Sequence, residues 1–369
     1  MIDEESAVVM FEKDCFNSED NYAPVAITTL SRFDCLKTVI QSLGNCSWAD
    51  KTDVYISIDY PSNEKYQHGY SEICKYLAEI QETHGFKSFN CYFHKSNLGP
   101  FDNYLWLVRL VLAKHEKIIL LEDDNEVAPC FLDFCNRALE IYKDSSDVVA
   151  VNPSDYVWCG NGFTPPIRTV AAGEANVEKR QMLWHGTAFW RDDILPYYAF
   201  VANQGFLAIG DNPSALLKLF RRCKVLCYQY LKDAYNGRDR APWNNGRLYS
   251  IDMAWDVAMI VFDKTAICPV ESLQRDLGVT GNGNSFTAAF SNADELRTRP
   301  LKKEQYFDFV HTSSVMLNTR ECALHDAKQH IRVGRWALTV LNYCVRLIKR
   351  KITGTCKQLH DPWSKNASR

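Results

Sequence analysis

Residues 118–124 read Ile-Ile-Leu-Leu-Glu-Asp-Asp, an apolar run that ends abruptly in three acids. A buried parallel strand typically appears as a continuous apolar run, and open α/β sheets gather their ligands at the carboxyl ends of such strands. Adjacent carboxylates repel one another unless a cation neutralises them, and Mg²⁺ or Mn²⁺ commonly bridges protein carboxylates to substrate phosphates. The stretch therefore predicts a metal-dependent phosphate or diphosphate site. The alternative is a solvated loop that happens to be acidic.

Short apolar strands and amphipathic helices alternate through the first 150 residues. We expect strands at 25–30, 53–59, 89–94, 118–121 and 148–152, separated by helices that begin near 31 and span about 64–84, 100–115 and 127–145. This alternation implies an α/β fold with a mostly parallel, Rossmann-like central sheet flanked by helices. Thr29-Leu30-Ser31-Arg32 follows the first strand without a Gly-x-Gly-x-x-Gly or Walker A loop, which argues against dinucleotide oxidoreductases and P-loop NTPases.

Charge and cysteine usage narrow the class of protein further. The 369-residue chain has a formal net charge of -3, so its overall charge does not attract nucleic acid. Its 14 cysteines include no Cys-x-x-Cys pair and no Cys/His cluster at zinc spacing, which indicates free thiols in a reducing compartment. The acidic start lacks a signal-peptide pattern, and no window offers a membrane-spanning apolar run. We therefore expect a cytoplasmic protein without a nucleic-acid partner.

Three motifs resemble GT-A fold glycosyltransferases, and most closely the N-acetylglucosaminyltransferase I type, in which Glu-Asp-Asp replaces the general Asp-x-Asp. They are Val-Ala-Ile-Thr-Thr-Leu-Ser-Arg at 25–32, Ile-Ser-Ile-Asp at 56–59 and Ile-Leu-Leu-Glu-Asp-Asp-Asn-Glu-Val-Ala-Pro at 119–129. The resemblance is clearest over 24–155 and weaker over 180–290, and we find nothing to match it after 300. It implies a GT-A (Rossmann-like) fold. The expected layout is an acidic lead-in (1–22), a nucleotide-sugar-binding half (23–155), an acceptor-binding and catalytic half of the same domain (156–300) and a C-terminal helical extension (301–369).

The resemblance also implies roles for residues at the strand ends. Arg32 and Asp59 would hold the nucleotide, with Asp59 accepting the uracil N–H. Asp124 would bind the metal, while Glu122 and Asp123 would assist through metal-bound water and the donor ribose or sugar. A cation on the diphosphate would stabilise the charge that develops as the nucleoside diphosphate leaves. Further expected donor contacts are Thr29, Asn97, Gly99 and Asn103.

Each of these residues also has a purely structural interpretation. Arg32 alone could be a surface arginine in the first turn of a helix. Asp59 alone could cap the turn before Pro61. Asn97 or Asp102 could simply cap the following helix.

An inverting transfer needs a general base on the acceptor hydroxyl, and a carboxylate is the usual choice in the analogous hydrolases. Ala254-Trp255-Asp256, followed by Pro269-Val270-Glu271-Ser272, is similar in order to the family's Trp-Asp base and the Pro-Glu-x-Ser stretch after it. Asp256 is therefore the predicted base, and Asp252 is the reserve. The alternative is an acid placed near a helix N-terminus, where it interacts favourably with the helix dipole.

The aromatic segment 183–191 resembles a Trp-Gly-x-Ala-x-Trp segment that frames the acceptor pocket in related bacterial transferases. The predicted acceptor-binding residues are Trp184, His185, Gly186 and Trp255. Packing of Trp184 in the core and simple hydrogen bonding of His185 within the fold are the alternatives.

The C-terminal segment from 329 onward carries nine Lys and Arg residues against the single acid Asp361. On a helical wheel, its apolar face contains Val333, Trp336, Ala337, Val340, Leu341, Cys344, Ile348 and Ile352, opposite Arg332, Arg335, Arg346, Lys349 and Arg350. Such a helix can lie on an anionic membrane surface, so we expect residues 331–352 to contact the inner face of the membrane. The alternative is a terminal helix docked on its own domain with a solvated basic face.

Together these features predict a metal-dependent inverting glycosyltransferase. We expect it to use Mn²⁺ or Mg²⁺ and to move a sugar from a nucleotide-sugar donor, expected to be a UDP-sugar, to a glycan or lipid-linked acceptor in bacterial surface polysaccharide synthesis. A sugar-nucleotide nucleotidyltransferase should show a glycine-rich basic loop after the first strand, and none follows Leu30. A non-catalytic nucleotide-sugar or glycan-binding protein would keep the aromatic patches without needing both metal and base.

Overall fold

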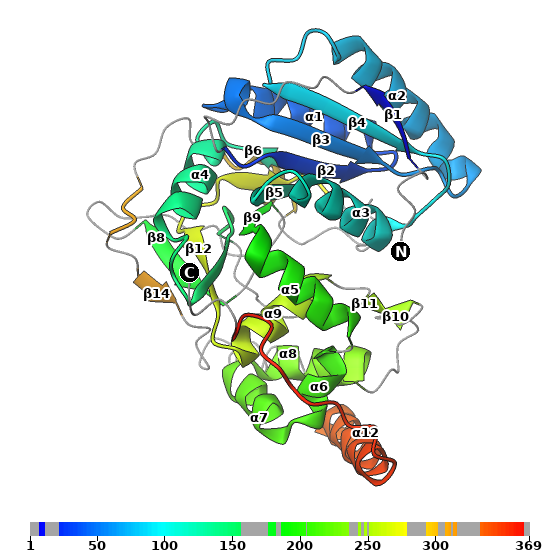
Figure 1. Ribbon diagram of the computed structural model, residues 1–369, viewed down its shortest axis with the longest axis vertical. Helices are drawn as coiled ribbons and strands as arrows, with labels where there is room; N and C mark the ends of the chain where they lie inside the picture. Colours follow the sequence, from blue (N-terminus) through cyan, green and yellow to red (C-terminus); the bar gives the residue numbers. More distant parts are fainter. Residues whose placement is uncertain are drawn as a thin grey trace.

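A ten-stranded sheet forms the centre of the molecule, with the strand order β1-β4-β3-β2-β5-β9-β7-β12-β8-β14 (Figure 1). The computed structural model describes residues 7–11, 22–155, 176–181, 186–203, 205–235, 243–244, 247–248, 251–278, 293–301, 307–310, 313–315 and 333–364. The strands of this sheet are β1 (Ala7–Phe11), β2 (Val25–Thr29), β3 (Asp53–Ile58), β4 (Ser88–His94), β5 (Lys117–Glu122), β7 (Val148–Val151), β8 (Val177–Arg180), β9 (Thr187–Trp190), β12 (Thr265–Pro269) and β14 (Ser313–Val315).

Four adjacent parallel strands, β4-β3-β2-β5, build the first half of the sheet and confirm the strands predicted there. They are linked by α1 (Phe33–Gly44), by the short η3 (Glu64–Tyr66) with α2 (Gln67–Ile80), and by α3 (Pro100–Leu112). The carboxyl ends of β2 and β5 lie side by side, because Thr28 pairs with Glu122. The acidic end of β5 therefore lies beside the segment that follows β2.

Each face of the sheet has its own core, because successive residues of a strand point to opposite sides. Val25 and Ile27 of β2 pack with the helices α1, α2 and α4 (Phe131–Ile141). Ala26 and Tyr55 belong to the other core, together with buried residues of α3, α5 (Arg191–Ala202) and α9 (Ile251–Val261). The predicted α/β class, with a central sheet flanked by helices, is confirmed. Five of the nine strand pairings described in this sheet are parallel.

Three local features differ from what the sequence patterns alone suggest. The acidic lead-in contains β1, which pairs antiparallel with β4. The segment 152–182 contains β8, which lies between β12 and β14. The helix expected over 127–145 begins only at Phe131, because β6 (Asn125–Val127) pairs with β13 (Gln274–Asp276) in a separate two-stranded sheet. All three differences come from pairing with distant strands, which local sequence patterns do not encode.

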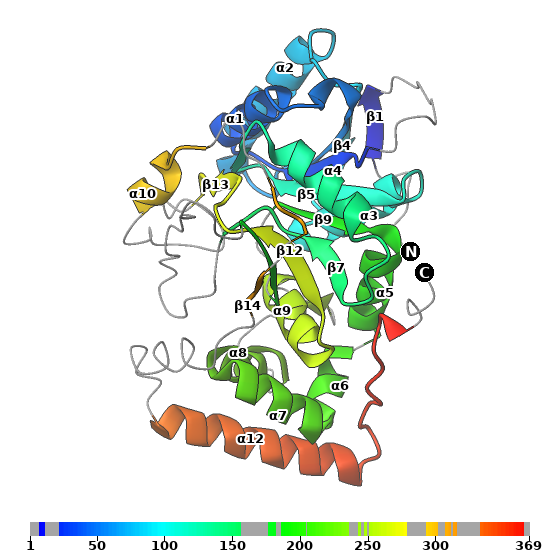
Figure 2. The same ribbon diagram turned by 90° about the vertical axis from the view of Figure 1, so that its left-hand side faces the viewer.

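A helical layer covers the lower end of the molecule in Figure 2. Residues 213–235 of this layer form α7 (Pro213–Arg222), α8 (Lys224–Gln229) and the π-helical η4 (Tyr230–Tyr235). The remaining elements are η2 (Ala49–Lys51), α6 (Gly205–Asp211), β10 (Trp243–Asn244), β11 (Arg247–Leu248), α10 (Ala293–Thr298) and α12 (Val333–Ile352). Among the residues that the structure describes, no helix has the length and apolar character needed to cross a membrane.

The C-terminal extension is fastened to this layer at two points. Arg350 of α12 donates two hydrogen bonds, of 2.7 and 2.6 Å, to the fully buried carboxylate of Asp211, which also accepts the hydroxyl of Tyr235 at 2.8 Å. Beyond α12, the chain returns to α5, where the indole N–H of Trp363 donates to the carbonyl of Asp193 at 3.1 Å. The extension is therefore packed against the second half of the chain.

We expect Trp363→Ala to lower the free energy of unfolding by about 3–5 kcal/mol, because it empties a buried aromatic site. Trp363 is 2% exposed, and its ring lies nearly parallel to that of Tyr197, with 6.0 Å between centroids. Urea denaturation of the full chain measures the change, with the exposed neighbour Ser364→Ala as control. Equal stability of the two variants would show that the tail is not part of the core.

Candidate active site

The acids after β5 are buried and held in defined positions. Asp123 and Asp124 are 3% and 5% exposed. The hydroxyl of Thr29, at the end of β2, donates to Asp123 Oδ2 at 2.6 Å. Asn125 accepts the backbone N–H of Glu122 at 3.0 Å and donates to Asp124 Oδ1 at 3.3 Å, so it closes the turn. The three predicted acids thus lie at the carboxyl edge of the parallel strands, with Thr29 fixing one of them.

Arg32 is the cation that these acids share. One guanidinium nitrogen pairs with Asp123 Oδ1 and the other with Asp124 Oδ2. Burial by itself lowers the pKa of Arg32, but the carboxylates of Asp123, Asp124 and Glu122 outweigh it and raise the pKa above its usual value. The arginine side chain still keeps 34% of its surface exposed. The structure therefore brings together Arg32, Asp123 and Asp124, which the sequence predicted as parts of one site.

A fourth acid, Asp276, joins the cluster from the second half of the chain. The β6–β13 pairing places Asp276 opposite Asn125, and the backbone N–H of Leu277 donates to the carbonyl of Asp124 at 2.8 Å. Burial raises the pKa of Asp124 well above its usual value, and the nearby Asp276 carboxylate raises it further against the effect of Arg32. The site thus places the carboxylates of Asp123, Asp124 and Asp276 around the guanidinium of Arg32.

Gly278 allows the side chains of Asp124, Asp276 and Arg32 to lie close to one another. A Cβ at position 278 would collide with Asp124 Oδ2 and would lie 3.1 Å from Asp276 Oδ1 and 3.2 Å from Arg32 Nη1. The three charged groups therefore surround one point on the backbone, and only glycine leaves that point open.

Sequence reasoning missed Asp276, and only a weak signal could have found it. The acid stands two residues before a glycine and accepts that glycine's backbone N–H at 2.7 Å. Its short strand is fixed by two distant contacts: Arg275 donates to both carboxylate oxygens of Glu126 at 2.6 and 2.8 Å, and Arg299 donates to the carbonyl of Gln274 at 2.8 Å. These partners are far apart in the sequence, so no local pattern points to them.

Asp59 follows β3 and organises the neighbouring loop. Its Oδ1 accepts the backbone N–H groups of Tyr60 and Leu98 at 2.9 and 2.8 Å. Its Oδ2 accepts the backbone N–H of Gly99 at 2.9 Å and the side-chain amide of Asn97 at 3.1 Å. Burial raises the pKa of this carboxyl, and the backbone N–H groups oppose that shift. A carboxylate has about four lone-pair sites, and these four hydrogen bonds occupy them. Asp59 could therefore accept a uracil N–H only by giving up one of these bonds, and the uracil contact stays a prediction.

The other predicted donor residues divide into exposed and buried groups. Gly99 has φ +81°, and a Cβ added there would meet no atom within 4 Å, so open space lies in front of it. Asn97 also donates to the carbonyl of Tyr60 at 2.6 Å. Asn103, in contrast, is 2% exposed and is hydrogen bonded to Ser57, which gives it a structural role here.

The predicted acceptor residues are placed only in part. Trp184 and His185 lie outside the described residues. Gly186 has φ +71°, and any side chain there would collide with Gln274. Trp255 is 2% exposed and stacks on Tyr197 with 3.6 Å between ring centroids, so its indole offers no free face to an acceptor.

The predicted base lies on α9. Asp256 is in the second turn of this helix and is 3% exposed. The side chain of the reserve residue, Asp252, lies outside the described part of the chain. The assignment of Asp256 as base stays a prediction.

The chemistry of the acid cluster fits a divalent cation that is shared with a phosphate. Among the described residues, no group of three or more His, Cys, Asp or Glu side chains could hold a metal by itself. Mg²⁺ in phosphate sites, however, commonly uses one or two carboxylates and takes its other ligands from phosphate and water. Asp124 and Asp276 are the candidate pair, because a carboxylate oxygen of each lies beside the position that a Cβ of residue 278 would take.

Comparisons with known proteins give fold-level likenesses alone. The sequence matches no protein-family model, and no curated protein sequence matches it either. Among solved structures, residues 1–349 of TarS from S. aureus align over 90% of this chain and 83% of that chain, with 9% identity and a TM-score of 0.41. The mannosyltransferase PcManGT from Pyrobaculum calidifontis, in complex with GDP-Man and Mn²⁺, aligns over 90% and 87%, with 12% identity and a TM-score of 0.34.

We expect Asp124→Asn to stabilise the metal-free protein at about pH 8 and to have no such effect near pH 4. The folded-state pKa of Asp124 is raised, first by burial and then by Asp276, so this carboxyl destabilises the fold as pH rises above its unfolded value of about 4. The asparagine at residue 124 carries no charge, so this loss of stability does not occur in the variant. Urea denaturation in EDTA across this pH range measures the effect, and the exposed Asp34→Asn is the matched control. A variant that is less stable than wild type at high pH would contradict the assigned pKa direction.

Proposed function

We propose that the chain is a GT-A fold, metal-dependent glycosyltransferase that moves a hexosyl or N-acetylhexosaminyl group from a nucleotide-sugar, with a UDP-sugar as the preferred candidate. One observation carries this proposal. Arg32, Asp123, Asp124 and Asp276 converge at the carboxyl edge of a parallel βαβ sheet that lacks a dinucleotide fingerprint. Ligands of open α/β sheets bind at this edge, and buried acids there suit a cation that bridges to phosphate.

The residues of the acid cluster would divide the work on the donor. Asp124, with Asp276 beside it, would hold Mn²⁺ or Mg²⁺, which would offset the charge of the departing nucleoside diphosphate. Arg32 is a planar bidentate donor, a geometry that matches phosphate as well as carboxylate, so it can transfer hydrogen bonds from the acids to the diphosphate. Thr29 keeps Asp123 oriented, and Glu122 and Asp123 remain candidates for the donor ribose or sugar.

The loop that follows β4 would bind the rest of the donor. Asp59 fixes Asn97 and Gly99 through hydrogen bonds, so the loop is ordered before any ligand arrives. The open space at Gly99 lets a ligand approach the backbone. In this arrangement Asp59 positions the loop. A direct contact of Asp59 with the uracil base is a separate proposal.

Asp256 is the proposed general base, which implies inversion at the anomeric carbon. A carboxylate on this helix can accept a proton from a hydroxyl, and Asp256 is 3% exposed. It would take the acceptor proton as the acceptor oxygen attacks the sugar. Gly186, and also Trp184 and His185 outside the described residues, would belong to the acceptor side.

The proposed acceptor is a glycan or a lipid-linked glycan at the inner face of a bacterial membrane, in surface polysaccharide synthesis. The exposed surface of α12 supports membrane contact. The helix docks through Trp336, Thr339 and Tyr343, whereas Leu341 and Ile352 on the opposite side are 59% and 80% exposed. Part of its apolar face therefore points away from its own domain, and α12 contains no acid.

We expect Asp124→Ala to abolish Mn²⁺-dependent binding of UDP, and Asp276→Asn to weaken it by roughly 10–100-fold, because each removes charge that the cation needs. Isothermal titration calorimetry with UDP, with and without Mn²⁺, gives both affinities. Asp34→Asn is the control, since Asp34 is exposed and lies on α1. Unchanged Mn²⁺-dependent binding in both variants would refute the metal assignment.

A second experiment separates a transferase from a binding protein. Asp256→Asn should lower UDP release from a panel of UDP-sugars by roughly 10²–10⁴-fold while UDP affinity stays unchanged, because a general base acts on the acceptor. The exposed Asp192→Asn should retain turnover. Full UDP binding without turnover in the wild-type protein across donors and acceptors would favour the non-catalytic alternative, and release of pyrophosphate from a nucleoside triphosphate would favour a nucleotidyltransferase.

A further inference from the structure

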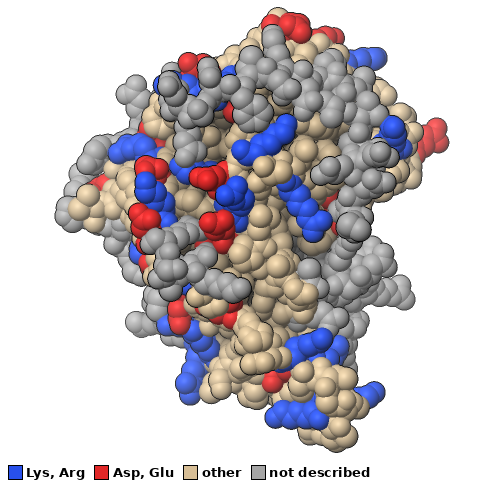
Figure 3. Space-filling model, in the orientation of Figure 1, with Lys and Arg blue, Asp and Glu red and all other residues tan. Residues whose placement is uncertain are grey.

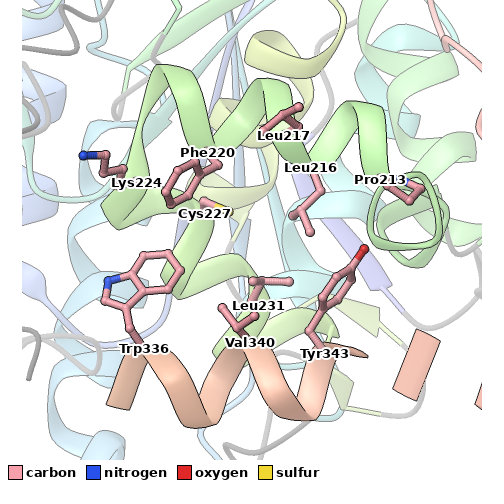
Figure 4. A pocket seen from close by; sticks show the side chains of 10 residues that line it. All are labelled: Pro213, Leu216, Leu217, Phe220, Lys224, Cys227, Leu231, Trp336, Val340 and Tyr343. Carbon is pink, nitrogen blue, oxygen red and sulfur yellow. The ribbon is translucent and has the colours of Figure 1, made fainter. Parts of the chain in front are cut away.

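An apolar groove separates α12 from the helices above it. Its volume is about 570 Å³, within the range of small-molecule sites. Figure 4 shows side chains of α12 rising toward those of α7, α8 and η4 across this space. The principal lining residues are Leu216, Leu217, Phe220, Leu231, Trp336 and Val340. The groove lies at the far end of the molecule from the acid cluster, so the proposed transfer reaction does not account for it (Figure 2).

The mouth of the groove is open to solvent. Leu217, Phe220 and Val340 line it and are 46%, 38% and 41% exposed. Val340 also borders the outward apolar side of α12, where Val345 and Ile348 are 60% and 56% exposed. Contiguous exposed apolar surface of this kind marks an interaction site. The groove and the outward side of α12 thus form one continuous apolar surface.

The charges around this surface favour an anionic occupant. Arg335, Lys349 and Lys351 are exposed on α12, and Asp211 of the neighbouring α6 is paired with Arg350. Figure 3 shows blue Lys and Arg side chains next to tan surface at the lower end of the molecule, where α12 lies. Among the described residues that line the groove, Lys224 is the charged one, and its ammonium lies 5.9 Å from the centroid of the Phe220 ring.

We propose that this groove receives one acyl chain of an anionic phospholipid from the membrane on which α12 lies. The hydrocarbon chain fits the apolar walls, and the headgroup phosphate meets Lys224 at the rim together with the cations of α12. The inference rests on the membrane contact proposed above and is independent of glycosyl transfer. It gives the C-terminal helix a lipid-binding site in addition to an interfacial surface.

Bromine on an acyl chain quenches tryptophan fluorescence at contact distance, and Trp336 lines the groove. The full chain is mixed with vesicles of equal parts phosphatidylglycerol and phosphatidylcholine whose acyl chains carry bromine. We expect quenching, and we expect the Trp336→Phe variant to lose a clear part of it while binding the vesicles equally well in a sedimentation assay. Vesicle binding with identical quenching in wild type and Trp336→Phe would overturn the groove assignment.

Val340→Phe and Leu341→Phe form a matched pair that tests the groove itself. Both add the same ring to adjacent residues of α12, but only residue 340 lines the groove. We expect both variants to bind vesicles, and only Val340→Phe to lose the Trp336-dependent quenching. Equal quenching in the two variants would contradict the inference. Absence of vesicle binding, with the wild-type chain dimeric by sedimentation equilibrium, would overturn it in favour of a second copy on this surface. UDP binding, measured in the same samples, reports separately on the donor site.

Discussion

The paired contact of Arg32 with Asp123 and Asp124 is the interaction on which the rest of the site depends. Four acids, including Glu122 and Asp276, lie close together at the end of β5, and burial makes their mutual repulsion costly. One arginine from the segment after β2 compensates part of this charge, and the parallel pairing of β2 with β5 keeps it in reach. In the proposed function, a divalent cation would bind to these acids and bridge them to the diphosphate.

This edge also joins the two halves of the chain. The β6–β13 pair brings Asp276 to Asp124, and Arg275 and Arg299 hold β13 in place through Glu126 and through the carbonyl of Gln274. The second half therefore contributes to the acid cluster, which is the proposed donor site, as well as to the proposed acceptor side. At the opposite end of the molecule, the Arg350–Asp211 pair and Trp363 fasten the C-terminal extension, which leaves Leu341, Val345 and Ile352 of α12 exposed.

Local sequence patterns predicted those parts of the structure that depend on local interactions. Continuous apolar runs located β2 to β5, and strand ends located Arg32 and Asp124, because the sheet's topology brings those ends together. The position of Asp276 depends on a strand pairing across 149 residues, seen in the contact of Arg275 with Glu126, and no local pattern encodes it. Likewise, a helical wheel shows the apolar side of α12 but not which side packs on the domain, because that depends on the contact of Arg350 with the distant Asp211. The sequence also did not reveal that Asp59 accepts four hydrogen bonds, because three of them come from residues 97–99 of a distant loop.

A crystal structure of the full chain soaked with UDP and Mn²⁺, with the metal located by anomalous scattering, tests the central claim most directly. The account predicts Mn²⁺ between the Asp124 carboxylate and a diphosphate oxygen, with Arg32 on the diphosphate and the nucleoside beside the 97–99 loop. UDP bound elsewhere on the molecule, or Mn²⁺ bound away from Asp124, would contradict it.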